Sequence, residues 1–206
     1  MHKTLVIIGA GGQGRIVADV ALNMNRYEHI VFLDEGNPDG ECLGFPIVGR
    51  IDEAHKYLES AEFFVAIGNG EVRAKKMCEL QEMNAKIATL IHPSAVIGTN
   101  VTIGEGTVIV AGAVINPCSS IGKGCIINTC TSVDHDCVVG DYVHVAAGAR
   151  LCGTVRVGNF TWVGAGAVVR HGISICEKCM IGISAAVVKD ITEAGTYVGV
   201  PAKRMK

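Results

Sequence analysis

The sequence predicts an α/β Rossmann-like domain followed by a parallel β-helix, because the chain of 206 residues changes its pattern once. Strand-like and helix-like segments alternate at first, which is typical of a parallel α/β sheet. From Ile91 onward, an aliphatic residue instead occurs at every sixth position as far as Val187. We therefore place the first domain at residues 1–88 and the β-helix domain, with its C-terminal tail, at residues 89–206.

Composition excludes several classes of protein. The formal net charge is −2, so the chain lacks the basic surplus of nucleic-acid-binding or membrane-surface proteins. Apolar runs are too short for a membrane-spanning helix, and the first residues lack the apolar core of a signal peptide. Nine cysteines, an odd number, do not suggest a disulfide framework. We expect a cytoplasmic protein whose cysteines are small buried apolar residues.

Short apolar runs and helical spacing define the elements of the first domain. The predicted elements, in chain order, are strand 4–8, helix 15–24, strand 30–33, helix 52–59, strand 63–67 and helix 71–83. The segment between the second strand and the second helix is rich in Pro and Gly and is predicted to be irregular. These elements amount to roughly half of a doubly wound nucleotide-binding fold.

A glycine motif separates the first strand from the first helix. Gly9, Gly11 and Gly14 form a GxGxxG pattern, and Asp34 lies 20 residues after Gly14, where a ribose-binding acid occurs in dinucleotide sites. The motif alone would indicate an NAD-dependent oxidoreductase. A helix N-terminus attracts phosphate of any kind, so a nucleotide-linked sugar fits equally well. A tight turn without a ligand is the third alternative.

The second domain repeats every six residues, a period that cannot place equivalent residues on one face of an α-helix, since six steps of 100° leave them 120° out of phase. A three-sided prism accommodates this period: each hexapeptide forms one side, and three hexapeptides form a coil of 18 residues. Small or β-branched residues four positions after each aliphatic one fill a second inward position. Residues 18 apart are thus expected to lie above one another, about 4.8 Å apart.

One polar cluster stands out in the predicted β-helix. Asp134, His135 and Asp136 fall at an outward corner, and a histidine oriented by a carboxylate is suited to act as a general base. Gly153 falls one coil further along, so its N–H is a candidate oxyanion donor beside the base. Solvated surface charges are the alternative explanation for the cluster.

Two further histidines each have two alternative roles. His171 is two coils from His135 and could form a channel wall beside it. His144 is half a coil away, so it could meet His135 only across an interface between two prisms. For both residues, a solvated surface histidine is the alternative.

Two further patterns in the sequence bear on metal and phosphate binding. The spacing of His135, His171 and Cys176 resembles that of the zinc ligands of γ-class carbonic anhydrases, but a cysteine replaces the third histidine. Cys176 and Cys179 form the one CxxC pair, which without further ligands does not indicate zinc. We therefore predict no metal. The basic tail that follows Gly199 is either free or available to phosphate groups.

Over nearly its whole length the chain resembles the hexapeptide-repeat acyltransferases in which a small nucleotide-binding domain precedes a left-handed β-helix. This group includes UDP-4-amino-sugar N-acetyltransferases of bacillosamine synthesis, GDP-perosamine N-acetyltransferases and sialic acid O-acetyltransferases. The matching stretches are IGAGGQG, FLDE, AIGNGEVR, NTCTSVDHDCVVGDYVHVAAGARLCGTV and VGVPAKRM. The resemblance implies a homotrimer with active sites between subunits, acetyl-CoA as co-substrate, and neither nucleic acid nor membrane as a partner.

The resemblance also implies roles for individual residues. His135 corresponds to the catalytic base and Asp136 to its partner, which is often Glu in relatives. Gly153 corresponds to an amide near the thioester oxygen. The residues implied in acetyl-CoA binding are His144, Gly153, Ala165, Ile183 and Lys203. The residues implied in holding the nucleotide-sugar are Gly11, Gly12, Gln13, Asp34, Glu35 and Gly68, where Gln13 replaces a frequent His.

The predicted function is acetyl transfer from acetyl-CoA to an amino group, at the 4-position, of a nucleotide-linked sugar, with His135 as base and no covalent intermediate. O-acetylation of sialic acid or of another sugar hydroxyl is an alternative. An NAD-dependent oxidoreductase and a non-catalytic trimer that binds sugar nucleotides are the alternatives from other classes. The sequence leaves the sugar, the nucleotide base and the pathway open.

Overall fold

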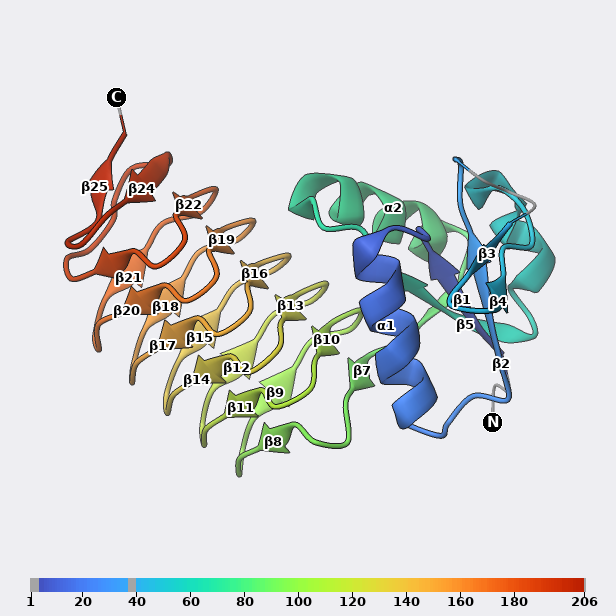
Figure 1. The fold of residues 1–206 in the computed structure, drawn as a ribbon, viewed down its shortest axis with the longest axis horizontal. Coiled ribbons are helices and arrows are strands. Elements are labelled where there is room, and N and C mark those ends of the chain that lie inside the picture. Colours follow the sequence, from blue (N-terminus) through green and yellow to red (C-terminus); the bar gives the residue numbers. More distant parts are fainter. Residues whose placement is uncertain (1–3, 37–39, 206) are drawn as a thin grey trace. The chain divides into compact units, whose positions relative to one another are not determined.

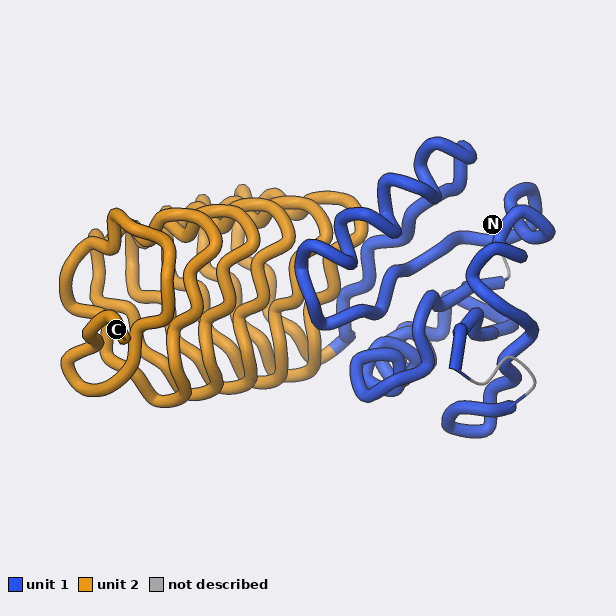
Figure 2. Tube along the Cα trace, turned by 90° about the horizontal axis from the view of Figure 1, so that it is seen from above, with its two compact units in different colours: residues 1–93 blue, residues 94–206 orange. Residues whose placement is uncertain are grey.

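The computed structural model describes residues 4–36 and 40–205, so Lys206 of the basic tail lies outside the described residues. The chain divides into two compact units, residues 1–93 and 94–206 (Figure 2). The first is an α/β unit with a parallel sheet and the second a β-helix, which confirms the predicted fold class.

The first unit is built on a parallel sheet with the strand order β2-β1-β5-β6. Its strands are β1 (Thr4–Ile8), β2 (His29–Leu33), β5 (Ala61–Val65) and β6 (Lys86–Ile87). Strand β1 pairs with β2 and β5 along its whole length. Residues 5–8 of β1 are completely buried, which explains why this segment is uniformly apolar.

Two helices complete the crossovers of this sheet. α1 (Gly12–Asn23) connects β1 to β2, and α2 (Gly70–Glu82) lies between β5 and β6 (Figure 1). Because crossovers of parallel strands are right-handed, α1 and α2 cover opposite faces. The winding direction therefore reverses between β1 and β5, and the crevice beyond their carboxyl ends is where sheets of this type bind ligands.

The sequence placed some elements of this unit incorrectly. The predicted helix 52–59 is a 3₁₀ helix, η1 (Ile51–Tyr57), whose one fully buried residue, Ala54, gives too small an apolar face to propagate an α-helix. The segment predicted to be irregular contains a small hairpin of β3 (Glu41–Cys42) and β4 (Phe45–Pro46). Strand β5 begins two residues earlier than predicted, since Ala61 pairs with Thr4 at the start of β1.

Each hexapeptide of the repeat forms a two-residue strand that ends at the predicted aliphatic position. The first of these strands, β7 (Leu90–Ile91), still belongs to the first unit. The strands of the second unit are β8 (Val96–Ile97), β9 (Thr102–Ile103), β10 (Val108–Ile109), β11 (Val114–Ile115), β12 (Ser120–Ile121), β13 (Ile126–Ile127), β14 (Ser132–Val133), β15 (Val138–Val139), β16 (His144–Val145), β17 (Arg150–Leu151), β18 (Arg156–Val157), β19 (Trp162–Val163), β20 (Val168–Val169), β21 (Ser174–Ile175), β22 (Met180–Ile181), β23 (Ala186–Val187), β24 (Thr196–Val198) and β25 (Lys203–Arg204).

These strands stack into the three sides of a prism. One side has the order β23-β20-β17-β14-β11-β8, the next β21-β18-β15-β12-β9, and the third contains β25-β24-β22-β19-β16-β13-β10. Pairing is parallel and in steps of 18 residues, so that Ser132 pairs with Val114 below and Arg150 above. The predicted register of the coils is therefore confirmed.

The interior of the prism is filled by the two inward positions of each hexapeptide. Every aliphatic repeat residue from Ile109 to Val187 is buried. At the other inward position, small polar residues bond to the next coil: Thr107 Oγ1 donates to the Gly122 carbonyl (2.8 Å) and accepts from the Cys125 N–H (2.9 Å). These bonds satisfy the polar groups that the tight interior buries.

The cysteines are not uniformly small apolar core residues, so that part of the prediction was wrong. Cys78, Cys118 and Cys130 are exposed. Cys125 and Cys137 are buried, yet they take the place of threonine or serine at the inner corner, and their thiols donate to carbonyls of the next coil at 3.1 and 3.2 Å. Burial raises the pKa of the Cys137 thiol to about 11, so it stays protonated in this role.

None of the helices in the described part of the chain has the length and apolar character needed to cross a membrane.

Candidate active site

His135 lies on the turn that joins β14 to β15, at an outer corner of the prism. Its imidazole Nδ1 is 2.8 Å from Asp136 Oδ2, and a little over half of each side chain is exposed, 57%. Asp136 has a φ of 58°, in the left-handed region that aspartate adopts more readily than most residues. The outward corner and the His–Asp pair therefore follow directly from the sequence DHD at this turn.

The Asp136 contact fixes the state of the imidazole. A carboxylate can only accept a hydrogen bond, so Nδ1 carries the proton and Nε2 keeps a free lone pair. The hydrogen bond to Asp136 raises the pKa of His135 above its ordinary 6.5; partial burial opposes this, and the charges of Asp134 and Asp136 add to it. His135 is therefore a stronger base than a free imidazole, and its Nε2 lone pair is available to accept a proton.

Gly153 lies directly against this imidazole, one coil further along the prism. A Cβ at position 153 would be only 2.5 Å from His135 Nε2 and 2.7 Å from Cε1. The Thr154 N–H donates to the His135 carbonyl at 2.9 Å and holds the two turns together. Within residues 4–36 and 40–205, the Gly153 N–H donates no hydrogen bond, so it can take an external acceptor.

The structure does not bring His144 to His135 within one chain, because His144 belongs to β16 on another side of the prism. Asn128 Oδ1 accepts from the Thr129 N–H (2.8 Å), which leaves Asn128 Nδ2 to donate to His144 Nε2 (3.3 Å). The His144 ring also meets Trp162 edge to face, with ring centroids 6.2 Å apart. His144 Nε2 is thus an acceptor and Nδ1 carries the proton.

The remaining residues implied in acetyl-CoA binding lie on other parts of the prism. Ala165 and Ile183 are 18 residues apart on the corner that follows the His144 side, and Ile183 is largely exposed. Lys203, in β25, lines a cavity of 350 Å³ together with Lys189 and Tyr197. His171 is exposed, two coils from His135. Ala165, Ile183 and Lys203 are therefore separate from the His135 corner within one chain.

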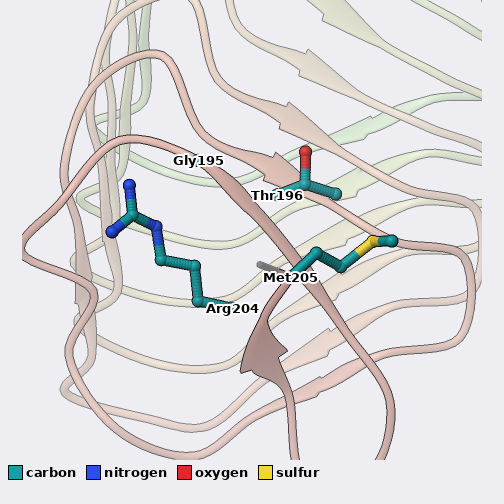
Figure 3. Close-up of a pocket in the computed structure, with 4 residues that line it drawn as sticks. All are labelled: Gly195, Thr196, Arg204 and Met205. Atoms are coloured by element: carbon teal, nitrogen blue, oxygen red, sulfur yellow. The ribbon is translucent and has the colours of Figure 1, made fainter.

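A second hollow lies beside the tail strands. Its volume is 580 Å³, and Gly195, Thr196, Arg204 and Met205 line it (Figure 3). Arg204 is already paired with Glu193 Oε2 at 2.7 Å, and its guanidinium lies against Gly195. This arginine therefore fastens the end of the chain to the preceding loop, a role that the sequence did not reveal.

In the first unit, the glycine motif forms the tight turn that its spacing predicts. Gly9 has a φ of 98°, and a Cβ on Gly14 would lie 2.2 Å from the Gly9 carbonyl oxygen. Gly11 and Gly12 are exposed at the start of α1, with open space where side chains would project. Gln13 follows them, and its Nε2 is buried without a partner among the described residues.

Asp34 and Glu35 both have partners within the first unit. Asp34 accepts from the Ala10 N–H and the Gly36 N–H, each at 2.8 Å, so its carboxylate holds the glycine turn in place. Glu35 pairs with Arg50 at 2.6 Å and borders a cavity of 310 Å³ between η1 and α2. Asp34 therefore stabilises the glycine turn, a structural role that its spacing from Gly14 did not reveal.

Arg73 was missed by sequence reasoning. Its side chain is 1% exposed, and Nη1 donates to the carbonyls of Ile67 (2.6 Å) and Gly68 (2.9 Å). A buried guanidinium is stable only when such partners are present, so Arg73 fixes the loop after β5. The signal in the sequence was a charged residue on the inner side of the predicted helix 71–83.

The described residues contain no cluster of three potential metal ligands. The Cys176 and Cys179 sulfur atoms lie 3.4 Å apart, and burial raises the pKa of Cys179 well above its usual range. The two cysteines do not form a disulfide.

The fold, an α/β domain followed by a β-helix of six-residue repeats, is that of the hexapeptide-repeat acetyltransferases. A family model described as the PglD N-terminal domain matches residues 4–80. GDP-perosamine N-acetyltransferase of Escherichia coli O157:H7 is 29% identical over 172 residues, covering 81% of this chain and 78% of that protein.

Two solved structures match over nearly the full length. The acetyltransferase domain of PglB from Neisseria gonorrhoeae FA1090, in complex with acetyl coenzyme A, is 34% identical with a TM-score of 0.96, covering 100% of both chains. PerB from Caulobacter crescentus, in complex with CoA and GDP-perosamine, is 34% identical with a TM-score of 0.93, covering 98% of this chain and 97% of that one. The chain belongs to the family of nucleotide-sugar N-acetyltransferases, and it is an acetyltransferase.

Replacing Gly153 by Ala tests the contact between Gly153 and the imidazole. The new methyl group collides with the end of a side chain that can rotate away, so the fold is expected to survive while the imidazole moves. We expect acetyl transfer to fall by more than about tenfold, since misplacing a catalytic group by about 1 Å is costly.

The readouts are steady-state turnover and the thermal midpoint. In a His135→Ala background, Gly153→Ala should cause little further loss. A full second loss of turnover in that double variant would mean that Gly153 acts independently of the imidazole.

Proposed function

We propose that this protein transfers the acetyl group of acetyl-CoA to the 4-amino group of a nucleotide-linked amino sugar, with His135 as the general base. The observation that carries the proposal is the His135–Asp136 pair lying against Gly153 at an outer corner. The family supports acetyl-CoA as the co-substrate and an amino sugar as the acceptor.

In the proposed reaction the amine nitrogen attacks the thioester carbonyl carbon while His135 Nε2 takes one proton from the amine. The C–N bond forms, and the negative charge on the former carbonyl oxygen faces the Gly153 N–H. The C–S bond then breaks, and the imidazolium returns its proton to the departing thiolate. The products are the acetylated amine and free CoA, so the steps balance without an acyl-enzyme.

Asp136 contributes by holding the imidazole. Its hydrogen bond keeps the proton on Nδ1 throughout and stabilises the positive charge that Nε2 acquires. Aspartate replaces the glutamate that is frequent in relatives, yet the 2.8 Å contact is of full hydrogen-bond quality. The shorter side chain therefore suffices at this turn.

We propose a homotrimer in which each site lies between two prisms. His144 on one chain would then reach the acetyl-CoA that lies at His135 of the next, which one chain alone does not achieve. Large apolar side chains that remain exposed on the last coils and tail support such an assembly; they are Val168, Met180, Ile183, Val198, Val200 and Met205.

The proposed ligands occupy different parts of the chain. Acetyl-CoA would contact His144, Gly153, Ala165, Ile183 and Lys203. The nucleotide would lie at the turn of the first unit, where Gly11, Gly12 and Gln13 stand at the start of α1. Asp34 and Glu35, which follow β2, and Gly68, which follows β5, would complete this site. We expect the reaction to take place in the cytoplasm, as the odd number of cysteines suggests.

Replacing His135 by Ala tests the proposed base. We expect turnover to fall by roughly 10²- to 10⁴-fold, the usual contribution of a general base, with the Kd for acetyl-CoA little changed. The measurement is release of free thiol from acetyl-CoA with GDP-perosamine as acceptor, beside calorimetric titration of acetyl-CoA. Normal turnover in this variant would refute the mechanism.

A panel of acceptors separates the alternatives. Transfer to UDP- and GDP-linked 4-amino sugars without transfer to sialic acid supports N-acetylation, and the reverse pattern would assign O-acetylation. Fluorescence titration with NADH, expected to show no binding, tests the oxidoreductase alternative.

Mixing two inactive variants tests the site between subunits. If His135 of one chain works with His144 of the next, trimers of mixed His135→Ala and His144→Ala chains regain roughly a quarter of the sites. Each variant alone is expected to show little turnover. A mixture no more active than its parents would place both histidines of a site on one chain.

A further inference from the structure

A second aspartate is built into the turn that carries the base. Asp134 Oδ1 accepts two hydrogen bonds, one from Asn116 Nδ2 and one from the His135 N–H, each 2.9 Å long. Asn116 lies one coil earlier, 18 residues before Asp134. Asp134 is half-buried, in contrast to the exposed His135 and Asp136 that follow it.

Other bonds tie the same turn to the coil below. Ser119 Oγ donates to the Asp134 carbonyl (2.7 Å), and the Asp136 N–H donates to the Pro117 carbonyl (3.1 Å). The backbone on both sides of His135 is therefore held by the preceding coil. Since the imidazole fits against Gly153 with no space to spare, this support decides where Nε2 lies.

The geometry of this turn does not by itself require a charge. At the equivalent place on another corner, the neutral Asn128 accepts from the N–H of the following residue at 2.8 Å, as Asp134 does. An asparagine at 134 would keep both acceptor bonds. The negative charge of Asp134 is therefore the feature that the turn does not explain.

We propose that Asn116 and Asp134 are positioning residues for the base: Asn116 holds Asp134, and Asp134 fixes the His135 backbone and places a second carboxylate beside the imidazole. This inference rests on the proposed function. When His135 takes the proton of the attacking amine, the negative charges of Asp136 and of the adjacent Asp134 both stabilise the imidazolium.

The electrostatic surroundings of His135 agree with this role. The hydrogen bond to Asp136 is the largest cause of its raised pKa, and the charge of Asp134 contributes in the same direction. The equivalent turns of the coils below and above carry Cys118 and Cys152, and neither contributes a basic side chain or a further carboxylate. Because His135 is exposed, the contribution of Asp134 is expected to be modest.

The replacement Asp134→Asn tests the charge, because it preserves the acceptor oxygen and changes little else. We expect kcat with GDP-perosamine to fall roughly three- to tenfold, while the KM values for acetyl-CoA and GDP-perosamine stay within about twofold. A base works when neutral, and loss of a nearby negative charge lowers the pKa of His135. The rising limb of kcat/KM should therefore move to lower pH.

Two further variants separate geometry from charge. Asp134→Ala removes both the hydrogen-bond acceptor and the charge, so it should lower turnover more than Asp134→Asn does. Asn116→Ala removes the hydrogen bond to Asp134 but keeps the Asp134 carboxylate. In that variant kcat should fall, while the rising limb of the kcat/KM profile should not move to lower pH. If Asp134→Asn fails to fold, NMR titration of His135 in the Asn116→Ala variant still tests the support.

The matched control is Asp141→Asn. Asp141 Oδ1 also accepts a backbone N–H, that of Lys123 at 2.9 Å, but on a different corner of the prism. This variant should leave kcat and the pH limb unchanged. If Asp134→Asn behaves like Asp141→Asn, with altered stability but normal kcat and pH limb, Asp134 is merely structural and the proposal is overturned. Normal turnover in His135→Ala would instead refute the proposed function itself.

Discussion

The register of the coils is the constraint on which the site depends. Parallel pairing in steps of 18 residues locks each turn above its equivalent, and a slip of one residue would turn the buried aliphatic side chains outward. His135 can lie against Gly153 because this register brings a residue without a side chain over the imidazole. The chemistry is thus set by stacking of the backbone, and the reactive groups occupy corners that packing leaves free.

Much of this arrangement could be predicted because the six-residue repeat determines which positions face inward and which turns lie above one another. The strand positions, the buried ladders and the neighbourhood of His135 and Gly153 all follow from a period of six. The first unit was less predictable, because side-chain contacts to backbone groups decide its details. η1 is a 3₁₀ helix, Arg73 holds the loop just before its own helix, and Asp34 holds the glycine turn 24 residues earlier. Residue type alone also did not reveal that Cys125 and Cys137 replace hydroxyl groups as interior donors.

The two units divide the work in a way that their chemistry explains. The second unit offers a histidine beside two carboxylates, which suits the proton transfer that we propose for it. The first unit offers a glycine turn at a helix N-terminus, and Gln13 there has a buried donor without a partner among the described residues. A helix N-terminus of this kind attracts phosphate groups, and the side-chain amide of Gln13 could donate to one. The imidazole of His135, in contrast, is stabilised in its protonated form by negative neighbours.

A crystal structure of the protein with CoA and GDP-perosamine bound tests the central claim most directly. The expected result is that the CoA sulfur lies at the corner formed by His135 and Gly153, with the 4-amino nitrogen within hydrogen-bond reach of His135 Nε2, about 2.6–3.2 Å. The Gly153 N–H should point to where the thioester oxygen would be. A CoA sulfur at another corner of the prism, or an amine remote from His135, would contradict the claim.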